Sequence, residues 1–205
     1  MSSPIDEFIR ELDHRWDGDP GPKITLRVLG SVALMMLTDY WRGTRDGDVL
    51  ETLELTPTIK GRLLALGGKG TPLAEKHHIY LDLVASGLPL LPHPPKYHEA
   101  TQLNETLEHF RVEVLDVTDV VVSKLKRFNA SDQKDIEEMA DRGLVDRDEL
   151  LKRFLAALDA AQMSAYADDF PNCVRNFHRV EREWLYTDES VIDLPGWVDD
   201  EEQGS

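Results

Sequence analysis

Two kinds of hydrophobic pattern divide the chain. Over residues 1–116, short apolar stretches with alternating or β-branched residues are separated by stretches of helical periodicity, which predicts strands interleaved with helices. After Asp116, apolar residues recur every three or four positions, which predicts helices only. The pattern therefore predicts an α/β (α+β) core over residues 1–116, in which a small sheet is flanked by helices. A helical region packed on that core would follow over residues 117–187.

Four segments of the core have the composition of strands: residues 24–29, 49–55, 78–85 and 108–115. The third has apolar residues on both faces, which is typical of an interior strand. Helices are expected where Ile5, Ile9 and Leu12 recur, and after Thr56-Pro57, since proline suits a first helical turn. A further helix, capped by Ser31, is expected over residues 32–41. Four more helices are expected at residues 117–128, 131–142, 147–163 and 171–186.

The net charge of the chain excludes some classes of function. Asp and Glu outnumber Lys and Arg by 39 to 23, giving a net charge of −16, which argues against a strongly basic nucleic-acid binder. Residues 188–205 hold seven of the acids and no base, leaving 32 acids against 23 bases. We expect that segment to be an acidic, mobile tail.

The compartment is indicated by cysteine content and by the amino terminus. Cys173 is the single cysteine, which excludes an internal disulfide and favours a reducing compartment. The first ten residues lack the pattern of a secretory signal, and the longest apolar run, residues 32–37, is far shorter than a membrane span. We therefore expect a cytoplasmic protein with no membrane partner.

Three aspartates form the first candidate site. Asp46 and Asp48 are two residues apart at the start of a predicted strand, so both side chains would project from one face. Asp82 lies within an otherwise apolar predicted strand, where a carboxylate is costly unless it is paired or bound to a metal. Clustered carboxylates repel one another unless a cation neutralises them, and Mg²⁺ or Mn²⁺ accepts such oxygen ligands.

Gly30-Ser31 stands at a predicted strand-to-helix turn. Glycine lets the backbone approach a phosphate closely, and the serine hydroxyl together with the N–H groups of a helix start can hold an anion. A phosphate-binding turn that faces three carboxylates provides the groups that metal-assisted phosphoryl or nucleotidyl transfer requires.

The order Gly30-Ser31, Arg42-x-Thr44-x-Asp46-x-Asp48 and Asp82 resembles the nucleotidyltransferase superfamily of the polymerase-β type. The Arg-x-Thr sequence resembles its bacterial toxin-associated branch, which includes abortive-infection toxins. The segment from Asp119 to Arg127, followed by Asp132 and Asp135, resembles the helical part that these proteins carry after the sheet.

The resemblance implies transfer of a nucleoside monophosphate from an NTP to a hydroxyl, with Mg²⁺ or Mn²⁺ as cofactor. Asp46, Asp48 and Asp82 would bind the metal, and Asp82 could instead take the proton of the acceptor hydroxyl. RNA or protein is the expected acceptor, and an antitoxin protein is the expected partner if the chain is one half of a toxin–antitoxin or phage-defence pair. The residues expected to contact the nucleotide or the acceptor are Gly30, Ser31, Thr44, Lys124 and Arg127.

Several alternatives stay open at this point. Gly47 replaces the apolar residue usual between the two acids, and because glycine can mark a bulge, the pair could be tilted apart. The chain would then be a catalytically impaired binding module. A third alternative is transfer to a small, aminoglycoside-like molecule. Lys124 and Arg127 could also form a solvated helix face that pairs with Asp132 or Asp135. A flexible loop at residues 67–70 could close over a nucleotide through Lys69.

Overall fold

The computed structural model describes residues 3–18, 21–162 and 169–194. The chain separates into two compact units. The first comprises Met1–Leu88 and Lys96–Asp116, and the second comprises Pro89–Pro95 and Val117–Ser205. Each unit is described by itself below.

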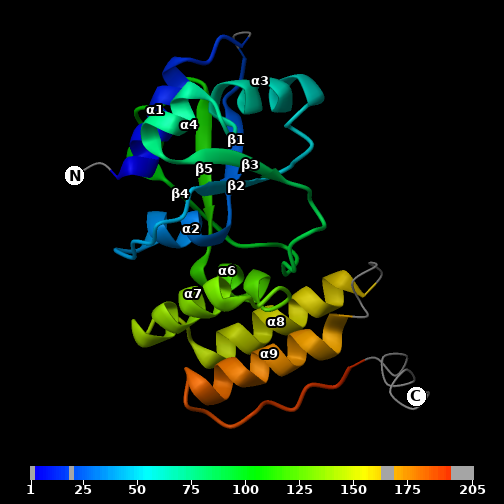
Figure 1. Ribbon diagram of the computed structural model, residues 1–205. Coiled ribbons are helices and arrows are strands. Elements are labelled where there is room, and N and C mark those ends of the chain that lie inside the picture. The colour runs from blue at the N-terminus through cyan, green and yellow to red at the C-terminus, as the bar shows by residue number, and fades with distance from the viewer. Residues whose placement is uncertain (1–2, 19–20, 163–168, 195–205) are drawn as a thin grey trace. The chain divides into compact units, whose positions relative to one another are not determined.

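A five-stranded mixed sheet organises the first unit (Figure 1). Its spatial order is β3-β2-β1-β5-β4. The β1–β5 and β2–β3 pairs are parallel, whereas β1–β2 and β4–β5 are antiparallel. The strands are β1 Ile24–Val28, β2 Asp46–Leu50, β3 Tyr80–Val84, β4 Tyr97–Glu99 and β5 Phe110–Leu115.

The two faces of the sheet differ in polarity. Leu26 lies opposite Val112, and Val28 opposite Val114, and all four are buried on one face. On the other face, Arg27 lies opposite Glu113 and donates to it at 3.0 Å. Alternation along the strands therefore gives the sheet one apolar face and one face with charged side chains.

Helices cover the apolar face, with α1, α3 and α4 gathered together in Figure 1. Gly67 at the end of α3 lies so close to Leu12, Phe8 and Leu81 that an added Cβ would stand 3.1 to 3.4 Å from their side chains. Asp13 ties α1 to the sheet, because its carboxylate accepts the backbone N–H groups of residues 108–110 at 2.8 to 3.0 Å. The helices of this unit are α1 Pro4–His14, α2 Gly30–Leu37, α3 Pro57–Gly67, α4 Pro72–His77 and α5 Thr101–Asn104.

The second unit is helical among its described residues. Phe154 of α8 stacks on Phe177 of α9 with ring centroids 4.7 Å apart, and both are fully buried. Arg153 donates to Asp119 at 2.7 and 2.6 Å and to the Pro94 carbonyl at 2.9 Å, which joins segment 89–95 to these helices. The helices are α6 Val117–Lys124, α7 Ala130–Asp141, α8 Arg147–Ala161 and α9 Phe170–Glu183.

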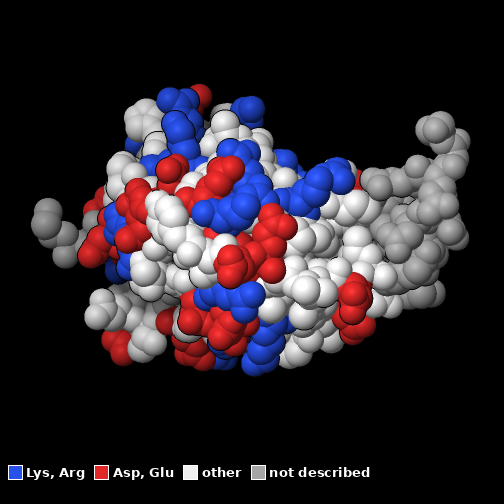
Figure 2. Space-filling model, turned by 90° about the horizontal axis from the view of Figure 1, so that it is seen from below, with Lys and Arg blue, Asp and Glu red and all other residues white. Residues whose placement is uncertain are grey.

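Positive and negative side chains are interspersed on the face shown in Figure 2. That face therefore presents no broad field of one sign. None of the described helices is long and apolar enough to cross a membrane.

The predicted class, a mixed sheet with flanking helices and a helical carboxyl-terminal region, is confirmed. Several local predictions are wrong. The strand expected at residues 78–85 is the edge strand β3 rather than an interior strand, and its first two residues lie outside β3. The strand expected at residues 49–55 is β2, Asp46–Leu50, so residues 51–55 lie outside it. The helix expected at residues 32–41 is α2, Gly30–Leu37. The short elements α4, β4 and α5 were not predicted.

The acidic segment predicted to form a tail from Asp188 begins in contact with α9. Ser190 is buried, and its N–H donates at 2.9 Å to Glu181, which is itself fully buried. Residues 195–205 of the predicted tail lie outside the described residues.

Candidate active site

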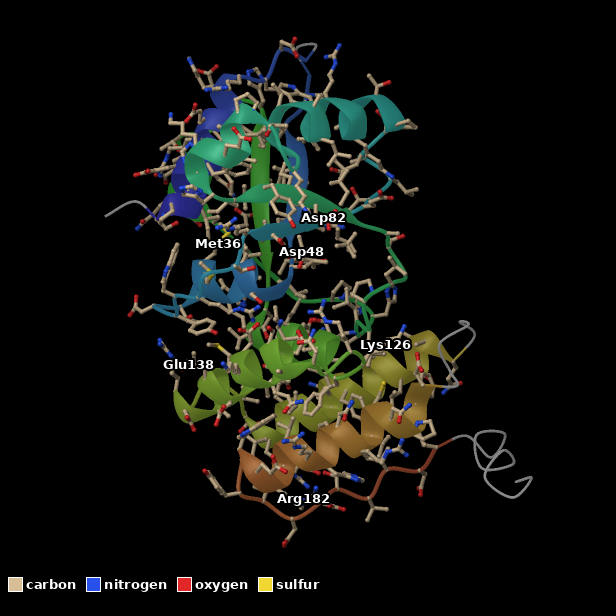
Figure 3. All side chains as sticks on the ribbon, viewed as in Figure 1. Met36, Asp48, Asp82, Lys126, Glu138 and Arg182 are labelled. Atoms are coloured by element: carbon tan, nitrogen blue, oxygen red, sulfur yellow. The ribbon has the colours of Figure 1, made fainter. Side chains whose placement is uncertain are left out.

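The three predicted aspartates lie on one face of neighbouring strands. In the parallel β2–β3 pairing, Asp48 is directly opposite Asp82, and Asp46 is opposite Tyr80. Residues two apart on a strand share a face, so Asp46, Asp48, Tyr80 and Asp82 project from the same side of the sheet. Figure 3 shows the side chains of Asp48 and Asp82 at this place. The antiparallel pairing of Val28 with Val49 puts Arg27 on this face as well.

Negative charge dominates the surroundings of Tyr80. Its hydroxyl donates a hydrogen bond to Asp46, and this bond, followed by burial and the charges of Asp46, Asp82 and Asp48, raises the pKa of Tyr80 to about 12. Asp46 and Asp82 are exposed, and Asp48 is half-buried. The phenol therefore stays protonated at neutral pH and holds Asp46 in place.

Gly30 brings the start of α2 against Asp48. The Leu29 N–H donates to the Asp48 carbonyl at 2.8 Å, which fixes the end of β1 beside β2. The next residue, Gly30, has a φ of +64°, and a Cβ there would stand 2.5 Å from Asp48 Oδ2. Glycine is therefore required both by the left-handed backbone and by the close carboxylate.

Ser31 is not the cap of this helix. The capping position is taken by Leu29, with no side-chain cap, and Ser31 stands in the first turn of α2. This corrects the predicted helix start by two residues. It also places the Gly30 and Ser31 N–H groups in the first turn, where helix N–H groups lack intrahelical acceptors.

Gly47 does not break the strand. The β2–β3 register runs one to one from Asp46 opposite Tyr80 to Leu50 opposite Val84, so the bulge considered from the sequence is absent from this pair of strands. A Cβ at Gly47 would lie 3.2 Å from the Tyr80 carbonyl oxygen, which is tighter than ordinary contact. The small residue thus fits the close approach of the two backbones.

Two further residues that the sequence suggested for the site, Thr44 and Lys69, lie close to this face. Thr44 is close to Asp46 in the sequence, and Lys69 is close to Tyr80 in the structure. Thr44 stands two residues before β2, and its N–H donates to the Arg42 carbonyl at 2.8 Å in a turn. Lys69, in the glycine-rich loop, has its amine 5.8 Å from the centroid of the Tyr80 ring. Gly68 of the same loop forms a parallel bridge with Leu81. The loop therefore lies along the β3 edge, beside the residues that carry the acids.

Lys124 and Arg127 belong to the second unit, where they bind other aspartates. The Lys124 amine lies 3.1 Å from Asp132 and 2.8 Å from Asp135, and all three side chains are buried. Arg127 donates to both carboxylate oxygens of Asp132 at 2.8 Å. The alternative that these bases pair with Asp132 and Asp135 is therefore seen. The Lys124 pairs are buried, whereas the Arg127 side chain is 70% exposed and reaches Asp132 from the surface. Their predicted contact with a nucleotide stays a prediction.

The face of the sheet that carries Asp46, Asp48 and Asp82, here called the acid face, offers oxygen ligands that suit a hard divalent cation. All three side chains offer carboxylate oxygens, and two of them are direct neighbours across β2 and β3. Among the described residues, no three Asp, Glu, His or Cys side chains are already arranged around a common metal position. Asp46 is held by Tyr80, so a third ligand from this set requires Asp46 to exchange that hydrogen bond for a metal.

Tyr80 is the residue whose part in the site was not predicted, whereas Lys69 was already considered as the residue of a loop that could close over a nucleotide. A signal for Tyr80 existed, because it precedes Asp82 by two residues and must share its face. No pattern in the sequence pointed to the pairing of Tyr80 with Asp46, since that depends on the register of two strands more than 30 residues apart.

One comparison with known proteins gave a match. The model of a family described as "nucleotidyltransferase of unknown function (DUF6036)" matches residues 3–185. No curated protein and no solved structure gave a significant match. The match spans both units, from α1 to the residues just after α9.

Proposed function

The chain belongs to this nucleotidyltransferase family, and from that premise we propose that it transfers a nucleoside monophosphate from an NTP to a hydroxyl. In this proposal Asp46 and Asp48 bind Mg²⁺ or Mn²⁺, and Asp82 is either a third ligand or the base that takes the hydroxyl proton. One observation carries the proposal. Asp48 and Asp82 are direct neighbours on one sheet face, and the start of α2 lies against Asp48.

The start of α2 is suited to the phosphates. The first-turn N–H groups of Gly30 and Ser31, together with the positive end of the helix dipole, favour an anion. Gly30 has no side chain to separate that anion from Asp48. A bound divalent cation would supply charge neutralisation between the phosphate oxygens and the carboxylates.

The transfer itself needs one bond made and one broken. The acceptor oxygen bonds to the α-phosphorus, the bond from that phosphorus to the bridging oxygen of pyrophosphate breaks, and the hydroxyl proton leaves to a base. Asp82 is the exposed carboxylate on the outer strand, so it is the member of the set best placed to accept this proton. Asp46 and Asp48 would hold the metal while the proton moves.

The chemical class of the molecule that carries the acceptor hydroxyl does not follow from the three aspartates. The resemblance predicts RNA or protein, in a toxin–antitoxin or phage-defence pair, with a small hydroxyl compound as the alternative. The impaired-module alternative rested on a bulge at Gly47, and the continuous β2–β3 register removes that reason for it.

Binding is the direct test. The full-length protein is titrated calorimetrically with each of the four NTPs, in non-hydrolysable form, with and without Mg²⁺. We expect at least one to bind only when Mg²⁺ is present, and we expect Asp48→Asn to weaken that binding about tenfold or more, because a carboxylate ligand is lost. Asp39→Asn is the matched control, since it removes an equal charge from an exposed site after α2.

Label transfer completes the test. The protein is incubated with α-³²P-labelled NTPs, a divalent metal, and total RNA, total protein or small hydroxyl compounds. Metal-dependent labelling that is lost in Asp48→Asn and kept in Asp39→Asn supports the proposal. The absence of both NTP binding and label transfer overturns it.

A further inference from the structure

A pocket of about 530 Å³ opens on the first unit and is lined in part by residues of β1 and β2. Arg27 and Leu50 belong to its walls, and the antiparallel pairing of Val28 with Val49 sets these two residues opposite each other. Leu50 follows Asp48 by two residues on β2 and shares its face, roughly 7 Å further along the strand. The pocket therefore begins where the row of carboxylates ends.

The pocket and the start of α2 lie in opposite directions from Asp48 along β2. Gly30 reaches Asp48 from the end of β1, on the side of Asp46, whereas the pocket lies on the side of Leu50 and residues 51–54. In-line displacement at phosphorus requires the incoming and leaving oxygens to stand on opposite sides. If the phosphates lie at α2, the incoming hydroxyl must come from the direction of this pocket.

The charges in the pocket wall select the class of acceptor. Arg27 is bound to Glu113 at 3.0 Å, and Lys60 is bound to Glu51 at 2.5 Å, so both cations are neutralised by neighbours. Glu54 also lines the pocket, and among the described residues it has no ion-pair partner. The uncompensated charge in the wall is therefore negative, which disfavours an anionic occupant.

The remaining wall is suited to a small hydroxyl compound. Ser86, in the turn after β3, offers an exposed hydroxyl, and Leu50 offers an apolar surface. A volume of about 530 Å³ is in the range of pockets that enclose small molecules. A nucleic-acid end would bring phosphates next to Glu54 on a protein of net charge −16.

We propose that this pocket is the acceptor site, and that the acceptor is a small polyhydroxyl compound without negative charge, either neutral or cationic. The inference rests on the proposed nucleotidyl transfer, because it assigns the acceptor of that reaction. Glu54 and Ser86 are its specificity-determining residues, and they bind the acceptor without touching the phosphates.

The experiment compares hexoses of different charge with two macromolecular acceptors. Transfer from labelled NTP is measured to glucosamine, glucose and glucose 6-phosphate, and to an RNA oligonucleotide and total protein. We expect label on glucosamine and glucose and not on glucose 6-phosphate. Glu54→Gln should raise KM for glucosamine roughly two- to fivefold and leave KM for glucose and for NTP unchanged, because only the amine loses a charged partner.

A blocking variant separates the acceptor site from the nucleotide site. Ser86→Trp places an indole at the pocket mouth and should lower transfer to glucosamine by roughly tenfold or more, with Mg²⁺-dependent NTP binding unchanged by calorimetry. Ala65→Trp, on an exposed position of α3 outside the pocket wall, is the matched control and should change neither.

The outcomes distinguish the two proposals. Mg²⁺-dependent NTP binding with label only on RNA, only on protein or only on glucose 6-phosphate overturns the assignment of the acceptor and leaves nucleotidyl transfer standing. Equal transfer by Ser86→Trp and Ala65→Trp also overturns it. Loss of NTP binding in the unaltered protein is a failure of the proposed function itself.

Discussion

The molecule holds two groups of aspartates that look alike in sequence and differ in their surroundings. In the first unit, Asp46 and Asp82 are exposed, and the charges of this group help to raise the pKa of Tyr80. In the second unit, Asp132 and Asp135 have side chains only 1% and 0% exposed, and both contact the Lys124 amine. Each group contains one short spacing, Asp46-x-Asp48 in the first and Asp132-x-x-Asp135 in the second.

The difference teaches what a buried carboxylate requires. Burial acts to raise the pKa of Asp132, but the Arg127 hydrogen bonds and the Lys124 charge outweigh it and hold that pKa below its usual value of 3.8. The second group is therefore neutralised from within the protein. The first group raises a neighbour's pKa, which is the mark of a surface that attracts cations. From this comparison we propose that the buried group serves stability and that the exposed group serves chemistry.

The substitution with the largest expected effect on the difference between the two groups is Lys124→Met. Two buried carboxylates would then lose their shared cation, and we expect a loss of about 3–5 kcal/mol in the free energy of unfolding, measured by urea titration. Lys152→Met, at a side chain that is 76% exposed and paired with Glu149, is the control and should cost less than about 1 kcal/mol. A Lys124→Met protein of normal stability that no longer binds NTP would reverse the assignment.

The second prediction concerns Asp82→Asn. We expect label transfer to fall about 10²-fold or more, because a metal ligand or the base is lost. The free energy of unfolding should stay the same or rise by a few tenths of a kcal/mol, because one of three like charges is removed. A marked loss of stability would show that Asp82 is paired like Asp132, and the contrast between the two groups would fail.

The same residues show which features of the fold and of the candidate site can be predicted from the sequence. Asp46, Asp48 and Asp82 were predicted to share a face because strand alternation is local and has a fixed period. The Thr56-Pro57 pair likewise predicted the start of α3, which begins at Pro57. Such features depend on residues that are neighbours in the chain. The resemblance to a known family rested, in addition, on the order in which the motifs follow one another.

Other features depend on contacts between distant residues. The edge position of β3 follows from the sheet order, and its apolar residues gave the pattern of an interior strand because Leu81 packs on the helices while Leu83 and Val84 are half-buried. The Tyr80–Asp46 bond and the proposed acceptor pocket depend on the register of the strands and on the placement of the loops. No periodicity of the chain encodes them.

A third prediction tests the contact between α2 and the acids. Gly30→Ala puts a methyl group 2.5 Å from Asp48 Oδ2 in a left-handed backbone, so we expect a loss of about 1–2 kcal/mol in unfolding free energy and weaker Mg²⁺–NTP binding. Gly43→Ala, where a Cβ meets nothing within 4 Å, is the control for the added methyl group. Unchanged binding in Gly30→Ala would separate α2 from the phosphates.

The smallest effect expected is a pH dependence in the buried group. Because the pKa of Asp132 is lowered on folding, its contribution to stability is complete above about pH 3.8 and is lost as pH falls through the folded value. Arg127→Gln should therefore cost up to about 1 kcal/mol at pH 7, with a difference from the unaltered protein that shrinks below pH 3.8. A constant difference across that range would show that Arg127 acts through packing.

The pairing of β1 with β5 has a consequence for the growing chain. All three aspartates of the acid face lie within the first 82 residues, yet β1 receives its second neighbour only when Phe110–Leu115 has been made. Until then, the backbone edge of Ile24–Val28 is open during synthesis, with Leu26 and Val28 beside it. The sheet thus closes late, over a sequence separation that makes folding slow and exposes a strand edge to other chains.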